Sequence, residues 1–350
     1  MKWKAGPELE KQIKNSDFEI NSQKTRMQYS ISRQTVTGLV VNRKANIKSE
    51  YYRLARSMCH SLFKEGKYDY KGAVGKADIG PLQGRLSHIH FVKFSEMKRA
   101  SEPQLPAANN KNSKDNKLVG WQKLYGRFLF YKNFVALERP LVICEGPTDS
   151  IYLRSAIQSL GANYPTLTTV KGGKRVLGIS FFKYGEHSER LLRLGGGSDK
   201  IKNFISTYPE ELKYFGHAPM KFPVIVLIDN DQGAGEIFSL MNSKFKSQVS
   251  LTTKLHSYPV CANLILVKTP ELGPTGDSKI ENFFAQEVLD VKLNGKVFNA
   301  AKKIDPTKEY GKTPFAENVV IPNKNKIDFS KFAPLLERIS LAITSYKPPP

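Results

Sequence analysis

The stretch "VIVLIDNDQGAGEIF", residues 224–238, decides the fold. Five apolar residues lead to Asp229, Asn230 and Asp231, and a glycine-rich, helix-like pattern follows. Strand side chains alternate between the two faces, so Asp229 and Asp231 are expected to project the same way. Two neighbouring carboxylates repel each other unless a cation lies between them, although either one can instead cap the next helix. The stretch therefore predicts a buried strand that ends at a metal site or at a helix cap.

Apolar strands alternate with helical patterns through the second half of the chain. The predicted strands are residues 140–144, 166–170, 223–229 and 263–268, and the predicted helices begin near Thr148, Ser198 and Gly233. Such strands, apolar throughout and separated by helices, predict an α/β fold with a mainly parallel sheet covered on both faces. The ligand site of such a sheet lies at the carboxyl ends of its strands. Residues 332–346 are expected to form one amphipathic helix packed on the sheet.

Acidic residues cluster where these strands end and where a later helix begins. Carboxylates that converge at one sheet edge suit Mg2+, with Mn2+ as the alternative, and a metal so held supports phosphodiester cleavage. Taken alone, Asp149 is also a good helix-capping residue. The expected metal ligands are Glu145, Asp149, Asp229, Asp231 and Glu281, and Lys279 is expected to act in catalysis by neutralising charge in the transition state.

The charge of the chain points to nucleic acid. Its 350 residues include 54 Lys and Arg but only 32 Asp and Glu, and the formal net charge of +22 is typical of proteins that neutralise phosphates. Cys59, Cys144 and Cys261 lack the spacing of a disulfide framework or a zinc site, which favours a reducing cytoplasm. No signal pattern and no long apolar run is present, so no membrane partner is expected.

The front half combines short strands with basic helices. Residues 18–47 alternate apolar and polar residues, which predicts small antiparallel strands, and residues 49–66 predict a helix from Ser49 to Gly66. Residues 101–117 have the composition of a linker. Basic and tyrosine side chains here either contact phosphates and bases or form a solvated face over a core. The predicted nucleic-acid contacts are Arg33, Lys44, Lys48, Tyr51, Tyr52, Arg53 and Arg56, and also Lys171, Lys174 and Arg175 in a glycine-rich loop expected to open on the acidic edge.

Three motifs carry a resemblance to a known fold. Residues 145–149 (Glu-Gly-Pro-Thr-Asp), residues 229–231 (Asp-Asn-Asp) and the pair Ile280-Glu281 resemble the acidic motifs of the Toprim fold, over residues 138–290. That fold is shared by topoisomerases, bacterial primases and the overcoming-lysogenisation-defect nucleases. The resemblance implies that Glu145 is a general acid/base or metal ligand, that the two aspartates bind metal, and that Glu281 acts with Lys279. No evident domain with a nucleophilic tyrosine and no zinc module is present, which favours nuclease activity.

The front half resembles another family. Residues 5–98 are similar to the end of the palm and the thumb of bacterial retron reverse transcriptases, through Lys24-Thr25-Arg26, Val36-Thr37-Gly38 and the "LQGRLSHIHF" of residues 82–91. The resemblance implies that Lys24 and Arg26 bind nucleic acid and that structured RNA or an RNA–DNA hybrid is the partner. The YxDD motif occurs nowhere, so this chain is not expected to copy RNA.

Together these resemblances imply five segments: a palm end (1–48), a thumb (49–100), the linker (101–117), a Toprim domain (118–290) and an extension with a packed helix (291–350). They predict the C-terminal part of a retron RNA-directed DNA polymerase that carries a toxic, Mg2+-dependent nuclease in defence against phage, controlled by retron RNA or DNA. The alternative is a non-catalytic, nucleic-acid binding scaffold. The substrate (DNA, tRNA or another RNA), the number of metal ions and the oligomeric state stay open.

Overall fold

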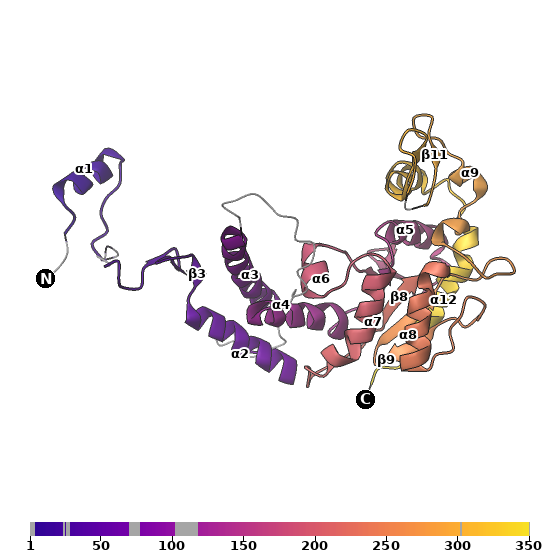
Figure 1. The fold of residues 1–350 in the computed structure, drawn as a ribbon, viewed down its shortest axis with the longest axis horizontal. Coiled ribbons are helices and arrows are strands. Elements are labelled where there is room, and N and C mark those ends of the chain that lie inside the picture. Colours follow the sequence, from indigo (N-terminus) through magenta and orange to yellow (C-terminus); the bar gives the residue numbers. More distant parts are fainter. Residues whose placement is uncertain are drawn as a thin grey trace. The chain divides into compact units, whose positions relative to one another are not determined.

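A computed structural model describes residues 4–23, 25, 29–69, 78–101, 118–301 and 303–349 (Figure 1). The chain divides into two compact units, Met1–Met58 with Asp78–Lys117 and Cys59–Ala77 with Leu118–Pro350. The predicted linker lies outside the described residues except for Ser101, and Lys24 and Arg26 lie outside them as well. Within the described ranges, no helix has both the length and the apolar character needed to cross a membrane.

The first unit contains short strands and long helices. Its elements are α1 (Pro7–Asn15), the antiparallel strands β1 (Thr35–Val36), β2 (Leu39–Val40) and β3 (Asn46–Ile47), the first part of α2 (Ser49–Glu65) and all of α3 (Gly80–Ser101). The expectation of small antiparallel strands is confirmed for residues 35–47. The helix expected at residues 49–66 is also confirmed, and it ends before Gly66, whose φ of +74° favours glycine.

A five-stranded sheet forms the centre of the second unit. Its order is β7 (Ser180–Phe181), β4 (Leu141–Cys144), β8 (Val224–Ile228), β10 (Leu264–Lys268) and β9 (Tyr258–Cys261). The first four strands are parallel and β9 is antiparallel, so the predicted α/β class with a mainly parallel sheet is confirmed. Leu141, Val224 and Leu264 are in register, which means that β4, β8 and β10 start level and reach the same edge.

Helices cover this sheet. Every residue of β4, β8 and β10 is buried, as their apolar runs predict. The expected amphipathic helix is confirmed as α12 (Ala333–Thr344), which shares one core with α5 (Asp149–Leu160) and the sheet. The remaining elements are α4 (Gly120–Phe130), η1 (Tyr131–Val135), α6 (Glu186–Leu191), α7 (Ser198–Leu212), η2 (Gln232–Ala234), α8 (Gly235–Phe245), η3 (Ile280–Phe283), α9 (Gln286–Leu289), β11 (Val297–Phe298), β12 (Glu309–Tyr310), α10 (Lys312–Pro314), η4 (Phe315–Val320), α11 (Ile321–Asn323) and η5 (Ser330–Phe332).

One predicted strand lies outside the sheet. Residues 166–170 were expected as a strand of the main sheet, but β5 (Thr168–Lys171) pairs with β6 (Lys174–Leu177) as a separate antiparallel hairpin, and β7 lies beside β4. Gly172 and Gly173 have φ of 57° and 72° and make the two-residue turn that sends the chain back. Thr168 Oγ1 donates to the carbonyl of Gly161, at the end of α5. The glycine-rich loop was expected to open on the acidic edge. Instead, its hairpin is anchored at Gly161, at the opposite end of α5 from Asp149.

Gly276 generates a stability prediction. Its φ is +79°, and a Cβ there would lie 2.4 Å from the carbonyl oxygen of Leu251, whereas Gly273 has φ of +61° and open space around it. Alanine at either position costs about 1 kcal/mol through the backbone, but only Gly276→Ala adds overpacking of about 1–3 kcal/mol. Urea titrations of both variants are expected to show the larger loss of unfolding free energy for Gly276→Ala. Equal losses would contradict this packing.

Candidate metal centre

Four carboxylates meet at the carboxyl edge of the sheet. Cys144 and Leu227 are paired in register, so Glu145 and Asp229 emerge from adjacent strands. The backbone N–H of Asp229 donates to Glu145 Oε2 at 3.4 Å, a long hydrogen bond. The backbone N–H of Ile280 donates to Asp229 Oδ1 at 2.9 Å, which brings the neighbouring Glu281 to the same edge. The fourth carboxylate, at the start of α5, follows β4.

That fourth carboxylate is Asp149, and it does not cap its helix. It is 6% exposed, it is the first residue of α5, and its Oδ2 accepts the backbone N–H of Gly146 at 2.7 Å. Burial, followed by the charges of Glu281 and Glu145, raises the pKa of Asp149 to about 7, although the Gly146 N–H and Lys312 oppose the shift. The capping alternative is therefore not what the structure shows for Asp149.

The pKa of Asp229 is also raised. Burial, followed by the charges of Asp149 and Glu281, raises the pKa of Asp229 to about 8. The hydrogen bond from Ile280 and the charge of Lys312 favour the ionised form but do not outweigh these effects. At this edge, burial first and the neighbouring carboxylates second thus favour the protonated forms of two carboxyl groups.

Lys312 forms an ion pair with one of these carboxylates, and no sequence motif pointed to it. Its Nζ lies 2.9 Å from Glu281 Oε1. Burial lowers the pKa of Lys312, but Glu281, Asp229 and Asp149 outweigh burial and raise it. Tyr152 of α5 fixes the backbone here, since its hydroxyl donates to the Lys312 carbonyl at 3.3 Å. Lys312 stands in the C-terminal extension, outside the three acidic motifs.

Asn230 holds the acidic segments together. Its side chain is fully buried, and its Nδ2 donates to the carbonyls of Leu251 at 2.8 Å and Gly276 at 2.6 Å. Its Oδ1 accepts from Lys268 Nζ at 3.1 Å, and its backbone pairs with Ser278 through two 2.9 Å hydrogen bonds. These contacts of Asn230 form a clamp between the acidic segments. Because neighbouring side chains alternate, the side chain of Asp229 faces the other way, toward the carboxylates. This role of Asn230 was not expected from the sequence.

A buried ion network supports the clamp. Lys268, the last residue of β10, is fully buried, and its Nζ lies 2.8 Å from Glu271 Oε1. Arg338 of α12 lies 2.5 Å from Glu271 Oε2 and donates to the carbonyls of Lys268 and Thr269. A lysine that ends an apolar strand was the only sequence signal for this network.

Asp231 and Lys279 lie at the start of the next helical turn. Asp231 Oδ1 accepts the backbone N–H of Gly233 at 2.9 Å, so Asp231 caps η2. Lys279 Nζ is 3.6 Å from Asp231 Oδ2, and the two side chains are 47% and 26% exposed, respectively. The capping alternative is thus seen for Asp231. Metal binding by Asp231 and catalysis by Lys279 stay predictions.

The carboxylate oxygens at this edge suit a hard cation, but in the described residues they are not arranged around one position. Within the described ranges, no three acidic, histidine or cysteine side chains already converge as a metal site. Glu281 is 3% exposed, and its Oε2 accepts no hydrogen bond from the described part of the chain. A buried oxygen without a donor costs free energy. Carboxylate oxygens of this kind are the ligands that Mg2+ prefers.

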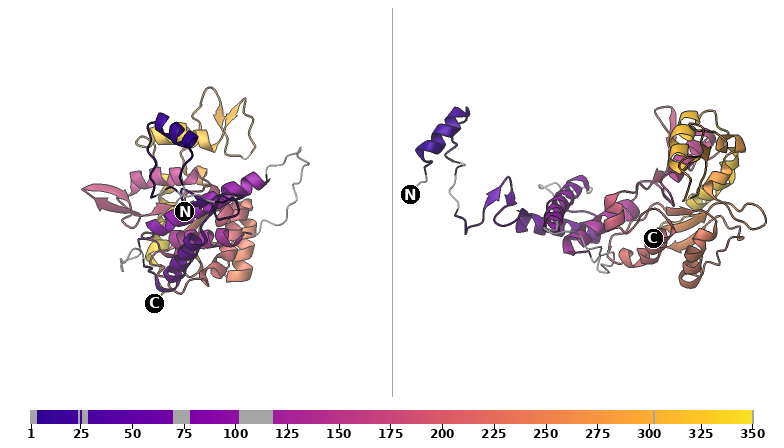
Figure 2. Two further views of the ribbon diagram at one scale, coloured as in Figure 1. Left: turned by 90° about the vertical axis from the view of Figure 1, so that its left-hand side faces the viewer. Right: turned by 45° about the horizontal axis from the view of Figure 1, so that its top comes forward.

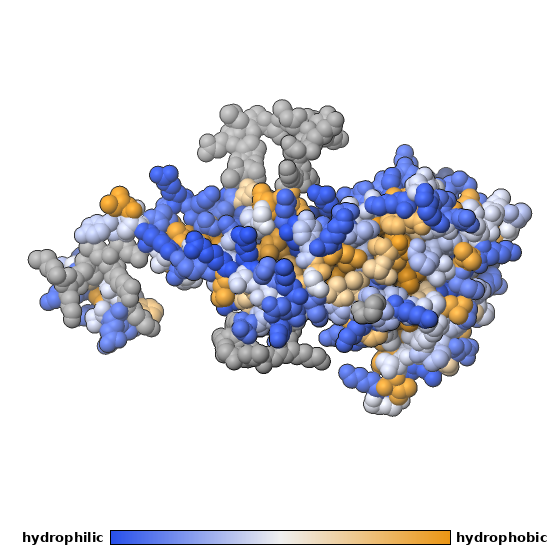
Figure 3. Space-filling model, turned by 90° about the horizontal axis from the view of Figure 1, so that it is seen from below, coloured by the Kyte–Doolittle hydropathy of each residue, from blue (hydrophilic) through white to orange (hydrophobic). Residues whose placement is uncertain are grey.

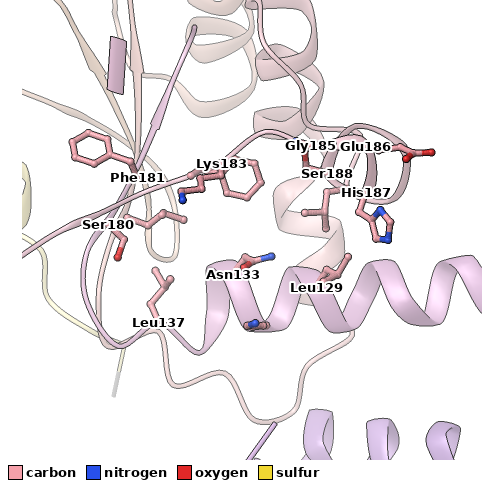
Figure 4. Close-up of a pocket in the computed structure, with 14 residues that line it drawn as sticks. Leu129, Asn133, Leu137, Ser180, Phe181, Lys183, Gly185, Glu186, His187 and Ser188 are labelled. Carbon is pink, nitrogen blue, oxygen red and sulfur yellow. Dashed lines mark hydrogen bonds between the residues drawn. The ribbon is translucent and has the colours of Figure 1, made fainter. Parts of the chain in front are cut away.

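A separate pocket of about 510 Å³ lies beside the edge strand β7 (Figure 4). Asn133 and Leu137 line one side, and Ser180 and Lys183 line the other. The residues that line it include none of the four carboxylates, so it is not the candidate site.

The predicted nucleic-acid contacts of the first unit are largely on its surface. Two of them have partners within the unit: Arg33 lies 3.3 Å from Glu50, and Tyr51 packs under Arg85 at 4.8 Å and beside His88. Hydrophilic residues prevail over the face drawn in Figure 3. Lys44, Arg53 and Arg56 are exposed, and Lys48 and Tyr52 are half-buried. Their binding of nucleic acid stays a prediction.

The raised pKa of Asp229 generates a pH prediction. The folded protein holds a proton there up to about pH 8, whereas the unfolded chain releases it near its ordinary pKa of 3.8. The stability of the metal-free protein therefore falls as the pH rises between these values, and Asp229→Asn, which mimics the protonated form, avoids this fall. In EDTA, the unfolding free energy of Asp229→Asn minus wild type is expected to increase by at least about 1 kcal/mol between about pH 5 and pH 8.5. Curves that stay parallel, as expected for the exposed Glu287→Gln, would contradict the burial of this charge.

No protein-family model and no solved structure matches the chain.

Proposed function

We propose that the second unit is a Mg2+-dependent nuclease of the Toprim type. The observation that carries the proposal is the convergence of Glu145, Asp149, Asp229 and Glu281, which come from three separate segments, at one largely buried edge. Excess buried carboxylates at the carboxyl ends of parallel strands are what a hard-cation site requires. The proposal also rests on the resemblance of residues 138–290 to the three Toprim motifs, the first two of which follow the adjacent parallel strands β4 and β8.

In this proposal the four carboxylates, together with Asp231, would hold Mg2+ or Mn2+. The bound metal would supply Lewis-acid stabilisation of charge on the reacting phosphate. We assign Glu145 the role of general acid/base that the resemblance implies, and Glu145 Oε2 lies next to the backbone of Asp229. Lys312 is close enough to the carboxylates to neutralise charge that develops on a phosphate held there. We assign this role mainly to Lys312 and only a small share of it to the more exposed Lys279.

We propose a regulatory role for the first unit. Its resemblance to a retron palm end and thumb, together with its exposed basic residues, supports binding of structured RNA or an RNA–DNA hybrid. In a retron-like defence against phage, that nucleic acid would restrain a toxic nuclease until infection disturbs it.

Cleavage assays test the proposed activity. Labelled tRNA, single-stranded DNA and duplex DNA are incubated with the full chain in Mg2+, Mn2+ or EDTA. Metal-dependent cutting of at least one substrate is expected, and Asp229→Asn is expected to cut at least about 100-fold more slowly because it removes one charged ligand. The Asp229→Ala, Asp231→Ala double variant should lose cutting altogether.

Glu287→Gln is the matched control, because Glu287 is exposed and lies near Glu281 in the sequence. It should cut like the wild type. Cutting that survives in EDTA or in the double variant would contradict the nuclease proposal. Absence of cutting on every substrate, with tight salt-sensitive binding, would favour the scaffold.

The two lysines generate a separate prediction. Lys312 lies 2.9 Å from the buried Glu281, whereas Lys279 lies 3.6 Å from the partly exposed Asp231. Lys312→Gln is therefore expected to lower kcat by about 100-fold, of the size seen when a charge-stabilising donor is removed. Lys279→Gln should stay within a few-fold of wild type, and Lys312→Arg should recover part of the loss. The reverse order would show that Lys279 is the catalytic cation.

A further inference from the structure

The β5–β6 hairpin is a basic ribbon that stands out from the second unit (Figure 2). Its ten residues, 168–177, contain Lys171, Lys174 and Arg175 and no acidic residue. Val170 is 69% exposed and Val176 is 39% exposed, although both lie in strands. Both faces of the hairpin are thus open near its turn, which is unusual for a two-stranded ribbon with valine on it.

The root of the hairpin is fixed and its turn is free. At the root, Thr168 Oγ1 donates to the Gly161 carbonyl at 3.1 Å, and Gly178 N–H donates to the Leu167 carbonyl at 2.9 Å. At the other end, a Cβ added to Gly172 or Gly173 would meet no atom within 4 Å. The ribbon is therefore held at one end and projects at the other.

The pairing in the hairpin brings like charges together. Lys171 is directly opposite Lys174, and Thr169 is opposite Val176 on the same face. Like charges directly opposite each other destabilise a ribbon. No acidic residue of the hairpin relieves this repulsion, and an anionic ligand would. The arrangement therefore favours a polyanion as the partner.

The shape of the ribbon selects among polyanions. Its two strands are about 4.8 Å apart, and the major groove of B-form DNA, about 12 Å wide, admits a ribbon of this width. The major groove of A-form RNA is too narrow for side chains to read. The exposed methyl groups of Val170 and Val176 suit contact with the thymine methyl group, which lies in the same groove.

We propose that the β5–β6 hairpin enters the major groove of duplex DNA, where Lys171, Lys174 and Arg175 bind its phosphates. The inference rests on the proposed nuclease function and names its substrate class. Helix α5 runs from Asp149 in the acidic edge to Leu160 beside the hairpin root. Its 12 residues span about 18 Å at 1.5 Å per residue, or about five base pairs at 3.4 Å each. The hairpin would thus hold the duplex about half a helical turn or more from the cutting position.

Binding in EDTA tests the hairpin independently of cleavage. Fluorescence anisotropy of a labelled DNA duplex is recorded with the full chain over a series of salt concentrations. The triple variant Lys171→Ala, Lys174→Ala, Arg175→Ala lacks three phosphate contacts. Its slope of log K against log salt is therefore expected to be less steep than that of the wild type by about 2.7. Lys171→Arg with Lys174→Arg should keep the wild-type slope, which separates charge from folding of the hairpin.

A charge-matched control replaces Lys221, Lys246 and Lys254, which are exposed and lie outside the hairpin, by alanine. Its slope should change by less than about one unit. If the control and hairpin variants lower the slope equally, the hairpin makes no special contact and the inference is overturned.

A further comparison tests whether the hairpin binds in the major groove. Methylation of guanine N7 in the DNA duplex, which blocks the major groove, should weaken binding of the wild type and not of the hairpin variant. An equal loss of slope on duplex RNA would overturn the groove assignment. If the hairpin variant has a less steep slope but the wild type cuts no substrate, the hairpin inference is supported and the nuclease proposal is contradicted. If the wild type cuts DNA but the hairpin variant keeps the wild-type slope, the nuclease proposal is supported and the hairpin inference is contradicted.

Discussion

The repulsion between carboxylates in a largely buried site is the constraint on which the account of this protein depends. Two unit charges 4 Å apart interact by about 4 kcal/mol at an effective dielectric constant of 20, and whole domains are stable by only about 5–15 kcal/mol. Such charges persist only when protons, a lysine or a metal ion neutralise them. The raised pKa values of Asp149 and Asp229 correspond to neutralisation by protons, and the ion pair of Lys312 with Glu281 corresponds to neutralisation by a lysine.

The rest of the second unit positions these charges. The level start of β4, β8 and β10 delivers Glu145 and Asp229 to one edge, and Asn230 ties the segment before Glu281 to the same place. Lys268, Glu271 and Arg338 connect that clamp to α12 and so to the core. A buried ion network of this kind is weak evidence for stability, and we assign it the role of fixing the geometry of the acidic edge.

The sequence predicted what continuous apolar runs determine. β4, β8, β10 and α12 follow from such runs, and the first two acidic motifs follow from where two of these runs end. β7 was missed because two residues are too short to show a pattern, and residues 166–170 were misplaced because the glycine turn was not given enough weight. Lys312 reaches the acidic edge only through tertiary packing on Tyr152, so local spacing had no means of revealing it.

A crystal structure of the full chain soaked in Mn2+ tests the central claim most directly, because the anomalous scattering of Mn2+ locates the ion without reference to activity. We expect an anomalous peak among Glu145, Asp149, Asp229 and Glu281, with Glu281 Oε2 as a ligand. A structure in which Lys312 keeps its ion pair with Glu281 while Mn2+ binds elsewhere, or nowhere, would contradict it.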